Sequence, residues 1–347
     1  KNYPDALRHY QKALELDPLY PEAYHNRGNV YAKIGMVKKA LEDYNKSIDL
    51  DEKNPHVYNS KCILLISLDR FEEAIKCIDK AILADPTEGA SYKNKGICLY
   101  NLKQFRSAIE FYNTSLEYHQ NCAATYSYKG EALNEVEFYE ESLKCFDKAI
   151  ELDSSASSIY FGKGYAVARS KDTNEAREYF NSALELEIAN EDALDPETQF
   201  ISGTRLEEAL KCYSNLSNSD RSQAEMFRNK GYLLLKLQQA SSAVEEYDNA
   251  LAINPNNSTL HDLKGSALLE MKDYDHAIAC FDQAIKFNPQ NCRAFAHKGV
   301  ALHKLKKYDE AINMYNTSIK MDTVFPMARI QREKCMKERD QSCTIFQ

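Results

Sequence analysis

Residues 258–291 read STLHDLKGSALLEMKDYDHAIACFDQAIKFNPQN, and the rest of the chain repeats this pattern. If Ser258 is position 1, position 8 is Gly265, and this position recurs every 34 residues except for one step of 67, between Gly164 and Gly231. The column at position 8 contains Gly28, Cys62, Gly96, Gly130, Gly164, Gly231, Gly265 and Gly299. A fixed period of this length is typical of a repeat protein, in which each repeat is one supersecondary unit.

Each repeat contains two predicted helices. Within 258–291, apolar residues recur at helical spacing over 259–271 and over 274–287, and a short polar turn lies between them. Two helices that each have one apolar face are expected to pack as an antiparallel hairpin. A single hairpin leaves apolar surface uncovered, so stability must come from stacking on neighbouring hairpins.

Two columns of the second helix are the most regular. Position 20 is small in every copy: Ala6, Ala40, Ala74, Ala108, Ser142, Ala176, Ala209, Ala243, Ala277 and Ala311. Position 24 is large and mostly aromatic: Tyr10, Tyr44, Ile78, Tyr112, Phe146, Phe180, Tyr213, Tyr247, Phe281 and Tyr315. Small residues repeated against large ones predict a close approach of the helices at the same place in every repeat.

Gly at position 8, Ala at 20, an aromatic residue at 24, Ala at 27 and Pro at 32 resemble the tetratricopeptide repeat (TPR) family over essentially the whole chain. The resemblance implies an all-α fold, a right-handed superhelical solenoid of TPR helix-turn-helix repeats. It also implies that the first helices line a concave groove for peptides or extended protein segments. At position 15, where the family usually has Gly, the first five full repeats have Gly35, Asp69, Lys103, Glu137 and Lys171.

The repeat pattern divides the chain into five parts. Residues 1–20 are expected to form the second helix of a truncated TPR unit, which indicates a piece of a longer protein. Five TPR units are expected over 21–190, a degenerate unit over 191–223 and three further units over 224–325. Residues 326–347 suit a C-terminal capping helix and tail, because their polar faces could cover the last apolar surface while staying soluble.

The degenerate unit has two interpretations. Its second helix is predicted over Thr204–Leu216, but Pro196 interrupts the region of the first helix and Gly203 ends it. One interpretation is a drifted repeat that still stacks on its neighbours. The other is a hinge, because the stability of a repeat array depends on contacts between nearest neighbours.

Composition restricts the function. The chain has 44 Lys and Arg against 52 Asp and Glu, a net charge of −8, which argues against nucleic acid as a partner. No apolar run approaches the ~20 residues of a membrane helix, so no membrane insertion is expected. The cysteines of position 23 (Cys77, Cys145, Cys212 and Cys280) recur two repeats apart, too far for a disulfide. Thiols that serve as small packing residues favour a cytoplasmic location.

The sequence shows no catalytic or cofactor-binding arrangement. The eight histidines are scattered, and the motifs HExxH, GxSxG and GxxxxGK[ST] are absent from the sequence. No CxxC pair is present to suggest a zinc site. We therefore predict no enzymatic activity, no cofactor and no metal.

Position 7 is basic in all eight full units: Arg27, Lys61, Lys95, Lys129, Lys163, Lys230, Lys264 and Lys298. Two interpretations are open. The aliphatic stems could pack while the charges reach water, or the charges could form a basic line for an acidic ligand.

The family resemblance places the groove at positions 2, 5, 6, 9, 12 and 13 of the first helices. The candidate groove residues are Asn26, Asn29, Lys93, Asn94, Glu131, Asn134, Tyr165, Arg169, Arg228, Asn229, Tyr232 and Arg293. Asn occurs at position 6 in only three units, so a ladder of amides that grips a ligand backbone is incomplete. Glu131 and Glu135 make the middle acidic, whereas Arg228, Arg293 and His297 make the end basic, which favours an extended ligand of mixed charge.

These observations predict a non-catalytic scaffold for protein–protein interaction that binds an extended peptide or a partner helix in the groove. One alternative is the targeting arm of a larger enzyme whose catalytic domain lies outside this sequence. Another is a chaperone adaptor for acidic C-terminal tails, although the family's clamp pattern matches only Asn29 in the unit at 21–54. The expected partner is a protein or peptide, and the sequence does not determine the oligomeric state.

Overall fold

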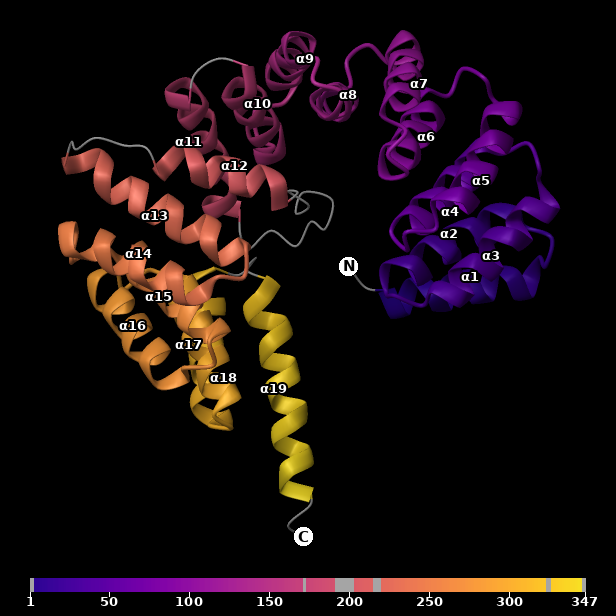
Figure 1. Ribbon diagram of the computed structural model, residues 1–347. Helices are drawn as coiled ribbons and strands as arrows, with labels where there is room; N and C mark the ends of the chain where they lie inside the picture. Colours follow the sequence, from indigo (N-terminus) through magenta and orange to yellow (C-terminus); the bar gives the residue numbers. More distant parts are fainter. Residues whose placement is uncertain (1–2, 171–172, 191–202, 215–219, 323–325, 345–347) are drawn as a thin grey trace. The chain divides into compact units, whose positions relative to one another are not determined.

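The chain is helical throughout the part that the structure describes. A computed structural model describes residues 3–170, 173–190, 203–214, 220–322 and 326–344, and within these ranges it contains helices and no strands (Figure 1). Contacts divide the chain into two compact halves, Lys1–Ser154 and Ser155–Gln347. The division falls inside the predicted run of five units. The prediction of an all-α fold made of helix-turn-helix repeats is confirmed.

The N-terminal half consists of one single helix followed by four hairpins. In each hairpin the two helices pack on each other, and each second helix also packs on the first helix of the next repeat. The helices are α1 (Tyr3–Leu16), α2 (Pro21–Lys33), α3 (Val37–Leu50), α4 (Pro55–Ile66), α5 (Phe71–Ala84), α6 (Gly89–Asn101), α7 (Phe105–Tyr118), α8 (Ala123–Glu135) and α9 (Tyr139–Leu152).

The C-terminal half begins with a hairpin whose second helix is longer than the others. Its helices are α10 (Ser157–Ser170), α11 (Thr173–Asn190), α12 (Gly203–Ser214), α13 (Asp220–Lys236), α14 (Ala240–Ile253), α15 (Ser258–Glu270), α16 (Tyr274–Phe287), α17 (Cys292–Lys304), α18 (Tyr308–Met321) and α19 (Pro326–Thr344). Helix α12 occupies the place of the second helix predicted over 204–216. The expected interruption of the first helix, around Pro196, and the turn residue Lys171 lie outside the described residues.

The position-8 glycines create the space for the position-24 rings. A Cβ atom added to Gly265 would lie 2.4 Å from Phe281 Cε1, and one added to Gly96 would lie 2.4 Å from Tyr112 Cε1. The same contact, at 2.7–2.9 Å, recurs between the other glycines of this column and their rings. Real Cβ atoms do not come this close to ring carbons, so any larger residue would have to displace a buried ring. The sequence predicted both columns but not that they meet.

One repeat departs from this pattern at both positions at once. The repeat formed by α4 and α5 has Cys62 at position 8 and Ile78 at position 24, and both side chains are fully buried in the same cluster. A larger residue on the first helix therefore accompanies a smaller one on the second, which keeps the total volume similar. Cys98 of the next repeat belongs to the same cluster, and its hydrogen bond to Cys62, together with burial, raises the pKa of the Cys62 thiol.

The turn inside each hairpin has a left-handed residue at position 15. This residue is Gly35 in the first full repeat, with φ of 77°. In the other described turns it is not glycine, although φ is 56–63°: Asp69, Lys103, Glu137, Gln238, Lys272 and Lys306. Side chains with a Cβ are strained in this region, so each of these turns costs free energy that glycine would not cost.

Replacing Lys272 with Gly is therefore expected to raise the free energy of unfolding by about 0.5–1 kcal/mol, because relief of the left-handed strain exceeds the extra entropy of glycine in the unfolded chain. Urea denaturation followed by circular dichroism would measure the change. The control is Gln283→Gly, at an exposed position in the middle of α16, which should destabilise by about 1 kcal/mol. Destabilisation by Lys272→Gly as well would contradict the prediction.

The last helix packs as a further first helix would. In α19, Ala328 and Cys335 are fully buried against a cluster that includes Ala311 and Tyr315 of α18. Arg332, at the place that corresponds to position 7, donates to Asn316 Oδ1 at 3.0 Å. Among the described helices, none combines the length and the apolar composition needed to span a lipid bilayer.

Candidate functional site

The position-7 cations face the second helices. Lys95, Lys264 and Lys298 form ion pairs of 2.7, 2.5 and 2.6 Å with aspartates at position 25 of the preceding repeat. Arg27 and Lys230 instead pair at 2.7 and 2.6 Å with a carboxylate at position 23 of their own repeat. These cations are therefore used within the fold, and the hypothesis that they form an open basic line for a ligand is wrong.

Other members of this column also have partners inside the fold. Lys61 Nζ donates to Asn45 Oδ1 at 2.7 Å, and Lys163 Nζ lies 4.2 Å from the centre of the Tyr179 ring. The hydrogen bond from Arg27 to Asp43 raises the pKa of the arginine, although burial opposes this shift. Position 7 therefore joins the two helix layers.

The predicted groove positions lie on the other side of the first helices, because positions 5, 9, 12 and 13 are about half a turn away from position 7. In the N-terminal half, Asn26 is exposed and Asn29, Lys93 and Glu131 are half-buried. Asn94 and Asn134 are buried, with 5% and 2% of their surface exposed. The four accessible residues can meet a ligand without any rearrangement of the fold, whereas the two buried ones cannot.

Two of these asparagines also support the hairpins. Asn29 Oδ1 accepts a hydrogen bond of 2.8 Å from the hydroxyl of Tyr44, and burial is the main cause that raises the pKa of this tyrosine to about 12. Asn134 Oδ1 lies 2.6 Å from the hydroxyl of Ser142. Ser142 is the one serine in the small column at position 20, so Asn134 compensates for a buried hydroxyl at this joint.

The first helices of the N-terminal half are also linked to one another. His25 on α2 and Ser60 on α4 form a hydrogen bond of 2.9 Å, and burial, with a smaller effect of His56, lowers the pKa of His25. Tyr100 on α6 donates to Glu135 on α8 at 3.4 Å. These contacts fix the spacing of neighbouring first helices and leave their outer surface accessible.

In the C-terminal half, the six candidates show the same range of burial as in the N-terminal half. Tyr165, Arg228 and Arg293 are half-buried, and Arg169 is exposed. Tyr232 is buried, with 1% of its surface exposed.

Asn229 is another buried candidate, with 1% of its surface exposed. It donates to Asn181 Oδ1 of α11 at 2.8 Å, and Asn181 also accepts from the Tyr213 hydroxyl of α12 at 2.5 Å. Asn229 thus joins three helices of the C-terminal half.

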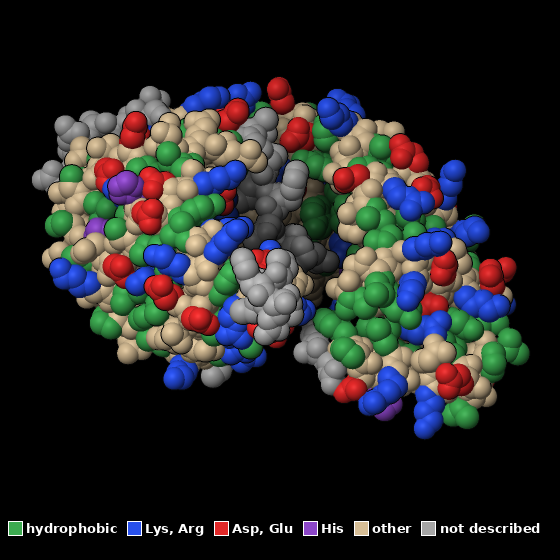
Figure 2. All heavy atoms as spheres, turned by 90° about the horizontal axis from the view of Figure 1, so that it is seen from below, with side chains coloured by type: hydrophobic (Ala, Val, Ile, Leu, Met, Phe, Trp, Pro, Cys, Tyr) green, Lys and Arg blue, Asp and Glu red, His purple; other side chains and the backbone are tan. Residues whose placement is uncertain are grey.

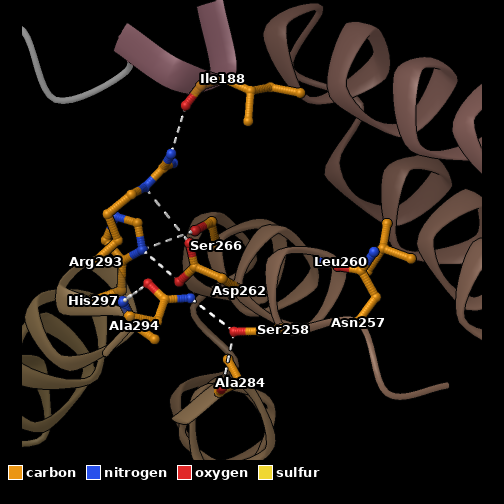
Figure 3. A network of polar contacts seen from close by, with 11 residues as sticks. Ile188, Asn257, Ser258, Leu260, Asp262, Ser266, Ala284, Arg293, Ala294 and His297 are labelled. Atoms are coloured by element: carbon orange, nitrogen blue, oxygen red, sulfur yellow. Dashed lines mark hydrogen bonds and ion pairs between the residues drawn. The ribbon is translucent and has the colours of Figure 1, made fainter. Parts of the chain in front are cut away.

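Arg293 and His297 enclose a buried carboxylate. Asp262 on α15 has 2% of its surface exposed, and its oxygens lie 2.9 Å from His297 Nδ1 and 3.7 Å from Arg293 Nε. Arg293 also donates to the backbone oxygen of Ile188, near the end of α11, at 2.6 Å. Figure 3 shows the arginine extended between the α11 carbonyl and Asp262. Two of the three basic residues that the sequence predicts at this end, Arg293 and His297, thus flank an aspartate.

The surface carries charges of both signs. Figure 2 shows Lys and Arg side chains interspersed with Asp and Glu over the face in view, with apolar side chains between them. In the described ranges, no group of three or more His, Cys, Asp or Glu side chains is placed to hold a metal ion.

Sequence comparison assigns the repeats. Models of the tetratricopeptide repeat match residues 21–54, 63–121, 129–193, 224–257 and 293–324, and a TPR repeat model matches 1–35 and 265–306. The chain belongs to the tetratricopeptide repeat family. A search of curated proteins finds no match to this TPR chain.

Solved TPR structures resemble parts of the chain. YrrB, described as a TPR protein with an unusual peptide-binding site, is 22% identical, covers 65% of this chain and 99% of its own, and gives a TM-score of 0.33. The Cut9–Hcn1 structure is 17% identical over 86% of this chain and 53% of its own, with a TM-score of 0.45. MamA from Desulfovibrio magneticus RS-1 is 22% identical over 49% of this chain and 96% of its own, with a TM-score of 0.44. These similarities concern the fold alone.

Two residues of the TPR first helices were missed by the sequence analysis. Asp262 occupies position 5 of α15, and the sequence analysis named the basic residues Arg293 and His297 of the next repeat but not this acidic residue. Ile63 occupies position 9 and has 51% of its surface exposed. Position 9 is one of the expected groove positions, but an apolar residue in a helical pattern is normally assigned to the core, so Ile63 was not among the candidates.

Proposed function

We propose that this TPR chain is a non-catalytic scaffold for protein–protein interaction. We call the side of the first helices that carries the groove positions the outer face, and we propose that this face binds an extended peptide or a partner helix. One observation carries the proposal: the columns that build the fold repeat, whereas the outer face does not. Position 8 is glycine in seven of the eight full repeats, yet position 9 in the N-terminal half reads Asn29, Ile63, Ile97 and Glu131.

Asn26 and Lys93 lie on this face, and the described residues offer neither of them a hydrogen-bond or ion-pair partner. They are therefore available to a ligand. A variable surface on a regular frame suits the recognition of one irregular chain by another.

The chaperone-adaptor alternative is less well supported. It requires positive charge that is available to an acidic tail, but Arg293 and His297 already flank the buried carboxylate of Asp262. Arg293 also donates to the α11 backbone. The buried thiols of Cys62, Cys98 and Cys145 are free, which supports a proposed location in the reducing cytoplasm.

Photo-crosslinking tests the proposed function. The crosslinking residue p-benzoylphenylalanine would replace Asn26, on the outer face of α2, or Leu83, which is 82% exposed on the second helix α5. After irradiation in a cell extract, we expect a discrete crosslinked protein from position 26 that is absent from position 83. Equal labelling from both positions, or no crosslinked protein from position 26, would contradict binding at the first-helix face.

A further inference from the structure

One row of side chains crosses the outer face of the N-terminal half. Helices α2, α4, α6 and α8 lie side by side in this order, and their positions 9 and 13 follow each other on one face because they are four residues apart. We call these residues the cross-face row. From α2 to α8 the row contains Asn29 and Lys33, Ile63 and Ser67, Ile97 and Asn101, and Glu131 and Glu135.

The middle of the row is apolar. Ile63 has 51% of its surface exposed, and among the described first helices of the eight full repeats it is the only large apolar residue this exposed within its helix. Ile97 on the adjacent helix is half-buried and packs against the cluster that contains Leu99 and Tyr112. Ile63 and Ile97 occupy the same position on adjacent helices, so the two apolar side chains are expected to lie next to each other on this face.

The two ends of the row carry opposite charges. Lys33 is exposed at the α2 end, beside the amide of Asn29. Glu131 is half-buried and Glu135 is exposed at the α8 end. A ligand that lies along the row would meet a positive end, an apolar middle and a negative end in turn. Opposite charges on the ligand would complement these ends, so its acidic residue would lie over α2 and its basic residue over α8.

We infer that the cross-face row binds an extended protein segment with an acidic residue over α2, an aliphatic residue over Ile63 and Ile97, and a basic residue over α8. This inference rests on the proposed function and specifies its ligand. Packed helices lie roughly 8–10 Å apart, so the three steps from α2 to α8 span roughly 24–30 Å. An extended chain advances about 3.3 Å per residue, and the bound segment is therefore about eight or nine residues long.

The C-terminal half does not offer an equivalent row. There, Tyr232 at position 9 of α13 is buried, and Ser266 at position 9 of α15 lies 3.4 Å from His297 Nδ1. Arg293 is occupied by the carbonyl of Ile188. None of these positions carries an exposed apolar side chain, whereas Ile63 in the middle of the cross-face row is 51% exposed.

Fluorescence anisotropy with synthetic peptides tests the inference. The probe is a fluorescein-labelled peptide of eleven residues, with central Leu, Asp four residues to one side, Lys four residues to the other, and Ser elsewhere. Both chain directions are made, because the row does not fix the direction of the backbone. The comparison peptides have Lys at both ends, Asp at both ends, or Ser in place of Leu.

We expect the Asp–Leu–Lys probe to bind about tenfold more tightly than each comparison peptide, and Ile63→Ser to weaken its binding about tenfold. The double variant Glu131→Lys, Glu135→Lys should instead prefer the peptide with Asp at both ends. Leu83→Ser is the control for the apolar change. The control for charge is Glu225→Lys, Glu270→Lys, at two exposed positions on first helices of the C-terminal half.

An unchanged peptide preference after charge reversal at α8, or equal losses in the control variants, would overturn the inference. The absence of binding by any of the peptides would also overturn the inference. Loss of binding in Arg228→Ala but not in Ile63→Ser would place the ligand in the C-terminal half, which refutes the cross-face row but leaves the proposed function intact. The crosslinking from position 26 decides the proposed function separately.

Discussion

Gly265→Cys is expected to lower the free energy of unfolding by about 2–3 kcal/mol, and adding Phe281→Ile is expected to recover much of this loss. A Cβ at position 265 would lie 2.4 Å from the buried Phe281 ring, so the ring must move within a packed core. The double variant has the pair found naturally in Cys62 and Ile78. It should therefore be more stable than Gly265→Cys alone.

Long repeat arrays can depart from two-state unfolding, so the measurement should combine urea denaturation with hydrogen exchange across α15 and α16. Thr259→Cys, at an exposed position on the same helix, controls for the added thiol and for helix propensity. A double-mutant cycle should give a coupling energy of about 1–3 kcal/mol between positions 265 and 281. If the two changes are additive, the ring and the glycine do not depend on each other, and the explanation of the two columns fails.

Asp262→Ala is expected to destabilise the C-terminal half by about 3 kcal/mol. The carboxylate is almost completely buried and lies 2.9 Å from His297 and 3.7 Å from Arg293. Removing one partner of a buried ion pair leaves the remaining charge poorly compensated, which costs more than the pair itself contributes. Thermal unfolding and urea denaturation at neutral pH would measure the loss.

Asp282→Ala is the matched control, because Asp282 also pairs with a cation of α17, Lys298, at 2.6 Å, but its side chain is 51% exposed. An exposed pair contributes about 0–1 kcal/mol. Similar effects of the two substitutions would show that the burial of Asp262 is not important for stability. If Asp262→Ala lowers the free energy of unfolding only slightly, and the double variant Asp262→Ala, Arg293→Met is as stable as the original chain, apolar packing can replace the charged network.

The sequence predicted those features that depend on periodicity. Period, helix pairing and the glycine, alanine and aromatic columns follow from residue types at fixed spacing, because each repeat must bury the same faces against its neighbours. The left-handed turn position could also be read from Gly35 and its replacements. The contact between the glycines of position 8 and the rings of position 24 was seen only in the structure, because spacing along the chain does not say which side chains meet.

The sequence was less informative about the candidate site. It predicted the face on which Asn26, Lys93 and Glu131 lie, but it could not separate them from Asn94 and Asn229, which have similar residue types and are buried. Burial of these asparagines depends on contacts with other repeats, such as that of Asn229 with Asn181, 48 residues away in sequence. No local pattern reports a contact of this range.

The sequence by itself therefore determined the repeat, its two helices and its family, because a period in residue type directly reflects a period in packing. Only the tertiary structure decided which charges are available. It paired the position-7 cations with second helices, placed Asp262 between Arg293 and His297, and left Ile63 uncovered. The physical reason is that the accessibility of a charged or apolar side chain depends on the neighbours that folding brings to it, and these neighbours come from other repeats.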